Sequence, residues 1–205
     1  MAFIAAGDRQ RIEAAIRAAE ATTSGELVTV IAHSSDSYLF LPTLFAALAA
    51  LTVPLLLWLL PWAVPTLVLF VLQVAIFVLA LLLFLWSPLR MRLIPHALKV
   101  HHAARLAREQ FFLRGLHETQ ERHGVLLFVS VAERYVEILA DRGIHARVPE
   151  GAWAGIVARF TEEVQAGRIA DGFVAAIAGC GALLSAQFPR RPDDRDELAN
   201  RLFEI

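Results

Sequence analysis

Four charged side chains next to predicted strands are the best candidates for chemistry in this chain. Hydrolysis of a phosphate ester needs cations or a metal to neutralise developing charge, together with a nucleophile or a positioned water. Glu26 begins a predicted strand, whereas Asp36, Asp141 and Arg142 follow the ends of predicted strands, where sites in open α/β sheets form. The catalytic candidates are therefore Asp141, Arg142 and Glu26, and the candidate metal ligands are Glu26, Asp36 and Asp141.

A structural interpretation of the same residues stays open. Asp141 and Arg142 are adjacent in a polar loop and could form an ion pair that only fixes this loop. Either no cofactor is bound, or the carboxylates hold a divalent cation, Ca²⁺ or Mg²⁺. Whether the chain is an enzyme is therefore open, and a weak metal-dependent phosphatase is the enzymatic alternative.

The seven histidines do not form a recognised metal-binding pattern. Residues 117–121 begin like a zincin helix, but Glu121 stands where the second histidine is required. His101 and His102 are adjacent, so on a helix they point to different faces. The acidic segment 193–197 lacks the alternating ligands and the glycine of a calcium loop. It is expected to be solvated, or to bind a basic partner.

A stretch of 53 residues, 37–89, contains no Asp, Glu, Lys or Arg. Because roughly 20 apolar residues cross a hydrocarbon core of about 30 Å, the stretch is too long for one span and suits two. Pro61 cannot continue a first helix, and Pro65 suits the opening turn of a second. The sequence therefore predicts a transmembrane hairpin with spans at residues 39–60 and 62–86.

Aromatic and basic residues predict how the hairpin is oriented. Tyr38 and Trp86 would lie at one membrane interface, and Trp58 and Trp62 at the other. Basic residues follow the second span, whereas the turn is uncharged: Arg90, Arg92, Lys99, Arg105 and Arg108. The positive-inside rule then places both termini in the cytoplasm.

The residues within the two predicted spans indicate what the chain could bind or transport. They contain no charged residue, which disfavours transport. Gln73 and the small pair Ala46 and Ala50 could pack against the helix of a membrane-protein partner, against a second copy, or within the hairpin itself. A net charge of −1 gives no electrostatic footprint for nucleic acid. The predicted partners are the lipid bilayer and another membrane protein or a homo-oligomer.

The flanking segments predict the elements of an α/β fold. Hydrophobic periodicity predicts a helix from a cap at Asp8 to residue 22, and β-branched residues predict a strand at 26–32. The following elements are predicted after the hairpin: a helix extending the second span over 88–94, a helix at 96–122, strands at 125–131 and 135–140, helices at 149–165 and 169–188, and helical turns within 196–203.

Each flank is too small to fold alone, so both are expected to form one domain. The fold class is α/β, a small mixed sheet flanked by helices as an α-β-α sandwich, split by the hairpin. The predicted organisation is residues 1–36 and 90–190 as the two parts of a cytoplasmic domain, 37–89 as the hairpin, and 191–205 as a charged tail.

Four phrases in this order resemble the TPM-domain family, named after thylakoid-lumen, photosystem-repair and receptor-modulator proteins. They are Ser-Gly-Glu-Leu-Val-Thr-Val at 24–30, Gly-Val-Leu-Leu-Phe-Val-Ser-Val at 124–131, Tyr-Val-Glu-Ile-Leu-Ala-Asp-Arg-Gly-Ile at 135–144 and Gln-Ala-Gly-Arg-Ile-Ala-Asp-Gly-Phe at 165–173. The likeness covers roughly residues 8–36 and 115–190.

The resemblance implies an α-β-α sandwich and, in some members, divalent-metal binding or weak phosphatase activity; others are assembly or repair factors. Two loops depart from the family's pattern. Arg-His-Gly at 122–124 replaces Asn-Asn-Gly, and Asp-Arg-Gly-Ile-His at 141–145 replaces Gly-Tyr-Gly-Leu-Glu. Because these loops would border an acidic site, the sequence favours an accessory, assembly or scaffolding protein, with a metal-dependent phosphatase-like hydrolase as the alternative.

Overall fold

The chain forms two compact units. The computed structural model describes residues 4–59, 65–149, 151–192, 194 and 196–205, and only the backbone of residues 53, 87 and 88. One unit joins Met1–Ser35 to Val100–Ile205, and the other is Asp36–Lys99. Trp62 and Pro61, which the sequence assigned to the hairpin's far end, lie outside the described residues.

A four-stranded mixed sheet forms the centre of the first unit. Its strands are β1 (Glu26–Ala32), β2 (Gly124–Ser130), β3 (Tyr135–Ala140) and β4 (Leu202–Glu204). In the order β3-β2-β1-β4, β1 runs parallel to both β2 and β4, and β2 runs antiparallel to β3. The predicted α/β fold with a small mixed sheet is confirmed.

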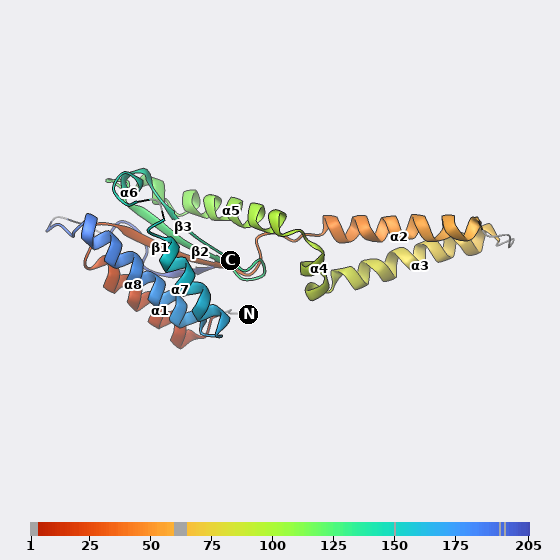
Figure 1. Cartoon of the computed structure of the whole chain (residues 1–205), viewed down its shortest axis with the longest axis horizontal. Coiled ribbons are helices and arrows are strands. Elements are labelled where there is room, and N and C mark those ends of the chain that lie inside the picture. The colour runs from red at the N-terminus through yellow and green to blue at the C-terminus, as the bar shows by residue number, and fades with distance from the viewer. Residues whose placement is uncertain (1–3, 60–64, 150, 193, 195) are drawn as a thin grey trace. The chain divides into compact units, whose positions relative to one another are not determined.

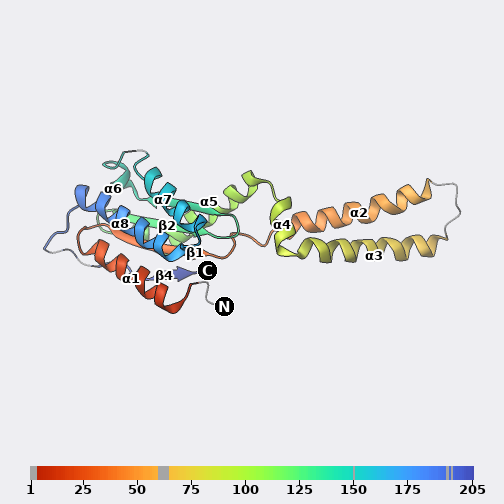
Figure 2. The ribbon, with the colours of Figure 1, turned by 60° about the horizontal axis from the view of Figure 1, so that its bottom comes forward.

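Helices cover both faces of this sheet (Figures 1 and 2). The helices of the unit are α1 (Ala6–Glu20), α5 (His96–Leu113), the short α6 (Arg142–His145), α7 (Ala154–Gln165) and α8 (Ile169–Gln187). Alternate residues of β1 point to opposite faces. Leu27 and Ile31 join the core beneath α1, α7 and α8, whereas Val28 packs with Phe111 of α5. Every residue of β1 and β2 is buried, as expected for strands covered on both sides.

The second unit is a helical hairpin. It contains α2 (Phe40–Trp58), α3 (Thr66–Leu85) and α4 (Ser87–Leu93). Ala46 and Ala50 are buried where α2 packs along α3, and the Phe45 and Phe84 rings lie 6.1 Å apart between centroids. Gln73 is half-buried.

The predicted interface residues differ in exposure. Trp58 and Trp86 are exposed, at 71% and 65%, whereas Tyr38 is buried at 5%. Three described helices are long and apolar enough to cross a membrane: α2, α3 and α8. Seven residues of α8 are buried, and five of them belong to the core beneath the sheet.

Local backbone chemistry corrects three predicted helix boundaries. Ala5, not Asp8, is the N-cap of α1, and Asp8 lies in its first turn. The helix predicted to run to residue 122 ends at Leu113, because Gly115 adopts φ +72° and a short 3₁₀ turn, Leu116–Glu118, follows. The second span does not continue through residues 88–94: Trp86 is extended at ψ 116°, and α4 is a separate helix.

The tail is also corrected. The helical turns predicted within 196–203 are wrong, because Leu202–Glu204 forms β4 instead. Pairing of Thr29 with Leu202 supplies β1 with its second parallel neighbour. Short-range periodicity could not predict a strand that depends on a partner far away in the sequence.

Candidate functional site

Two of the predicted site residues, Glu26 and Asp141, lie at the same end of the sheet's strands. Glu26 pairs in register with Gly124, the first residue of β2. The backbone N–H of Asp141 donates to the Gly124 carbonyl at 2.9 Å, so Asp141 borders the same residue from β3. Asp36 follows the opposite end of β1 and belongs to the other unit. The seven residues of β1 span roughly 20 Å, so Glu26 and Ala32 lie far apart at its two ends.

Glu26 instead meets two carboxylates that the sequence did not nominate. One oxygen from each of Glu20, Glu26 and Asp196 lies within 4.8 Å of the others. Glu20 is the last residue of α1, and Asp196 belongs to the segment leading to β4. The cluster therefore forms only because the C-terminal segment returns to the sheet. No local sequence motif predicts this contact.

Backbone donors hold two of these carboxylates in place. Glu26 is only 7% exposed and accepts hydrogen bonds from the N–H groups of Glu197 and Leu198, at 3.0 and 3.2 Å. Oε1 of Glu20 accepts from the N–H of Leu27 at 2.9 Å. The other oxygen, Oε2 of Glu20, is buried without a hydrogen-bond partner among the described residues.

Burial raises the pKa values of two of these carboxyl groups above the ordinary value of a glutamate. It raises the pKa of Glu20 to about 8, and the nearby charges of Glu26 and Asp196 add to the effect. It raises the pKa of Glu26 to about 7, again with a contribution from Asp196. A bound cation would favour the ionised forms. Three convergent carboxylates are ligands that suit Ca²⁺ or Mg²⁺.

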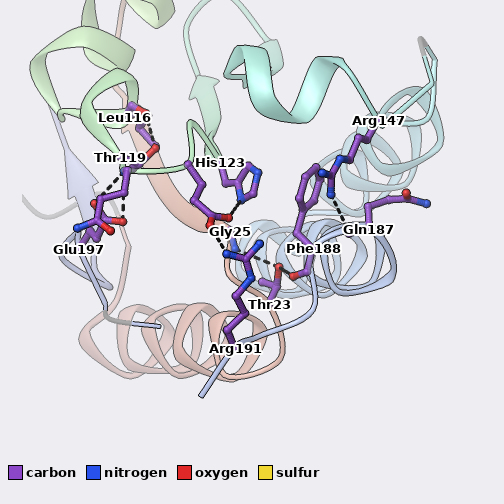
Figure 3. A network of polar contacts seen from close by, with 12 residues as sticks. Thr23, Gly25, Leu116, Thr119, His123, Arg147, Gln187, Phe188, Arg191 and Glu197 are labelled. Carbon is purple, nitrogen blue, oxygen red and sulfur yellow. Dashed lines mark hydrogen bonds and ion pairs between the residues drawn. The ribbon is translucent and has the colours of Figure 1, made fainter. Parts of the chain in front are cut away.

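A polar hollow of about 340 Å³ lies beside this cluster. Its lining residues are Ser24, Thr119, Gln120, Glu121, His123, Arg191, Asp194 and Glu197. In Figure 3, Thr119 and Glu197 lie on one side of His123, and Phe188 and Arg147 lie on the other. Asp194 also lines the hollow around the carboxylate cluster, so the two hollows adjoin.

His123 is the most enclosed titratable group of this polar hollow. It is 8% exposed, and its ring lies 4.2 Å from that of Phe188 between centroids. Burial lowers the pKa of His123, although Glu121, 3.4 Å from its Nδ1, opposes this. Arg191 also forms an ion pair with Glu121. His123 is part of the loop in which this sequence departs from the family's pattern.

Asp141 has a clear structural role, and Arg142 is exposed beside it. Oδ1 of Asp141 accepts a hydrogen bond from the N–H of Arg142 at 2.7 Å and thereby caps α6. Its Oδ2 lies 4.0 Å from Arg122, not from the Arg142 side chain. A Cβ on Gly143 would stand 2.7 Å from the Arg122 carbonyl, so this close approach requires glycine.

This chain was compared with known protein families. Residues 93–183 match the model of the TPM domain family. This stretch of the chain is similar to the TPM domain. Most of the matched residues, 100–183, lie in the same unit as α1, β1 and β4, so the sheet of this unit also contains strands from outside the matched stretch.

A solved structure shares the fold of this chain. It is the NMR structure of the BA42 protein from the psychrophilic bacterium Bizionia argentinensis sp. nov., with a TM-score of 0.63 and 20% sequence identity. The alignment covers 100% of this chain and 97% of that chain. A search of curated proteins found no match. At this identity the likeness supports the fold alone.

Proposed function

We propose that this chain is a membrane-anchored accessory protein. Its TPM domain would lie at the cytoplasmic face of a bacterial inner membrane and bind a membrane-protein partner there. The observation that supports this most is the surface of α3: its mean hydropathy is 3.1, and none of its residues is buried. A helix that is apolar all round needs lipid or another protein around it.

Two spans are proposed rather than three. Phe173 and Ile177 of α8 are fully buried against the sheet. A Cβ on Gly181 would stand 2.8 Å from the Cβ of Ala19, so α8 packs closely on α1. Removing α8 to a membrane would dismantle this core. The orientation follows from the basic residues after Trp86, which favour cytoplasmic ends.

The test is affinity purification of the tagged full chain from native membranes in mild detergent. We expect one membrane protein to be recovered in near-equimolar amount with the wild type and several-fold less with Gln73→Leu. Val74→Leu, at an exposed neighbouring position, is the matched control and should recover the wild-type amount. Recovery of no membrane protein above an untagged control would contradict an accessory role.

One observation favours a second function, metal-dependent hydrolysis of phosphate esters. Glu20, Glu26 and Asp196 converge, and Oε2 of Glu20 has no hydrogen-bond partner among the residues that the structure describes. In this alternative the three carboxylates hold Ca²⁺ or Mg²⁺, which would neutralise charge on the substrate.

Turnover of p-nitrophenyl phosphate by the purified chain, with and without each ion, distinguishes the two functions. A hydrolase should lose at least tenfold in turnover on Glu26→Gln and keep its rate on Asp36→Asn at the opposite end of β1. The accessory function predicts no turnover above buffer for any of the three proteins. Metal-dependent turnover with no partner recovered would make this protein an enzyme.

A further inference from the structure

Helix α5 has a buried face and a basic face. Its buried residues pack on the sheet: Ala103, Ala104, Ala107, Gln110 and Phe111. His101, Arg105, Arg108 and Phe112 are exposed and follow one another at spacings of four, three and four residues, so they form a single stripe along the helix. We call these four residues the α5 stripe.

The α5 stripe contains two arginines and no acidic residue. No Asp or Glu occurs between residues 37 and 108, and Glu109 is the first acidic residue of α5. None of the ion pairs among the described residues includes Arg105 or Arg108. The stripe therefore complements an anionic surface.

Exposed apolar side chains end the stripe. Phe112 and Leu113 are 61% and 68% exposed, although large apolar groups in water cost free energy. A helix that combines basic residues with exposed Phe and Leu is typical of segments that lie at a lipid interface. A soluble acidic protein would match the charge but gives no reason for the exposed phenylalanine and leucine together.

The stripe also follows closely on the second apolar helix in the sequence. α5 begins ten residues after Trp86, and the two residues Trp86 and Ile94 have extended backbones that separate α3, α4 and α5 into distinct helices. α5 is therefore not a rigid continuation of α3. Its first turn is connected to the proposed span by one short helix that itself carries Arg90 and Arg92.

We propose that the α5 stripe, with Leu113, binds the anionic lipid headgroups of the leaflet that the hairpin enters. This deepens the proposed function, since it rests on the membrane anchoring but not on any partner protein. The arginines bind lipid phosphates, and Phe112 and Leu113 enter the headgroup boundary. The domain is then held at the surface by a second contact besides the hairpin.

A fluorophore on Leu113→Cys tests this in the full chain reconstituted into nanodiscs. The native Cys180 does not interfere, because it is buried and burial raises the pKa of its thiol to about 12. Quenching by headgroup-labelled lipids is compared between discs of phosphatidylcholine and discs containing about one third phosphatidylglycerol. We expect at least twofold more quenching in the anionic discs, and loss of most of this excess at roughly 0.5 M salt, where screening is strong.

Matched variants distinguish lipid binding by the α5 stripe from an effect of the protein's net charge. Arg105→Gln with Arg108→Gln should remove most of the excess quenching, whereas Arg159→Gln, exposed on α7 across the sheet, should leave it unchanged. A label on Ala186→Cys of α8 should show no dependence on lipid charge. Equal quenching in both kinds of disc, or an unchanged excess in the arginine variant, would overturn the proposal.

If the hairpin did not anchor the chain in the membrane, the experiments would give a different result from a failure of the α5 contact alone. A protein without membrane spans would be released from native membranes by alkaline carbonate and would not incorporate into discs of either lipid. A chain that stays in the carbonate-resistant fraction but shows no lipid-charge dependence keeps its anchor and loses only the α5 contact. The two outcomes are therefore distinguishable with the same preparations.

Discussion

The hairpin and the domain use similar apolar residues in opposite ways. In α3 none of the residues is buried, whereas in β1 and β2 every residue is. The hairpin closes by contacts between neighbouring helices, while β1 pairs with a strand that begins 98 residues later, at Gly124. The hairpin is therefore formed by contacts between segments that are close in the sequence, and its outer surface is apolar and unburied. The domain forms only when segments from both ends of the chain come together.

Removing the hairpin should have the largest effect on this comparison. If Asp36–Lys99 is replaced by a flexible Gly-Ser linker, we expect nearly all of the protein to move from the membrane fraction to the supernatant and to remain folded. The reason is that neither core cluster contains a residue of that unit. Fractionation and circular dichroism measure the outcome.

The intact chain is the control for this deletion, and it should stay in the pellet after carbonate washing. Persistence of the deleted form in the membrane fraction would assign membrane binding to the domain. Loss of its secondary structure would mean that the domain core depends on the hairpin.

Truncating one phenylalanine in each region should separate the two kinds of burial. Phe128→Ala in β2 removes a fully buried ring and should cost about 3–5 kcal/mol of unfolding free energy. Phe70→Ala in α3, where the ring is 62% exposed, should cost less than about 1 kcal/mol in detergent, since no protein cavity forms. Urea denaturation in detergent measures both, and equal costs would refute the distinction.

The carboxylate cluster predicts a pH dependence confined to the domain. Because the pKa values of Glu20 and Glu26 in the folded chain, about 8 and 7, lie above 4.5, the folded state binds more protons than the unfolded state between these values. Stability should therefore fall as pH rises from about 5 to 8. Glu20→Gln should gain about 2 kcal/mol over the wild type at pH 8.5 and nothing at pH 4, by urea denaturation at each pH.

A divalent cation should oppose this loss. Millimolar Ca²⁺ should stabilise the wild type at pH 8.5 and have a smaller effect on Glu20→Gln, because a folded-state ligand raises the unfolding free energy. A wild type whose stability is flat across this range would show that the pKa values of the two carboxyl groups are not raised in the folded chain.

The smallest expected effect distinguishes the two interpretations of Asp141 and Arg142. Asp141→Ala removes the cap of α6 and should cost about 1 kcal/mol. Arg142→Ala should change stability by less than about 0.5 kcal/mol, since its side chain is exposed. Thermal denaturation of both variants checks this. Similar losses for the two would favour an ion pair between the side chains.

Sequence patterns predicted local elements well and the site only in part. Strands 26–32 and 135–140 agree with β1 and β3, because β-branched runs bounded by turn residues define such strands locally. Glu26 was nominated, but Glu20 and Asp196 were not. They meet only because α1 packs under the sheet and the tail returns beside β1 as β4. Contacts between distant segments leave no periodic signal.

Cysteine accessibility tests most directly whether a hairpin splits one cytoplasmic domain. Single cysteines replace Ala14 on α1, Leu59 at the end of α2 and Ala158 on α7, all exposed. With a membrane-impermeant maleimide, Leu59→Cys should label only in intact spheroplasts, and the other two only in inverted vesicles. Labelling of Ala14→Cys and Ala158→Cys from opposite sides would contradict a single domain formed by both ends of the chain.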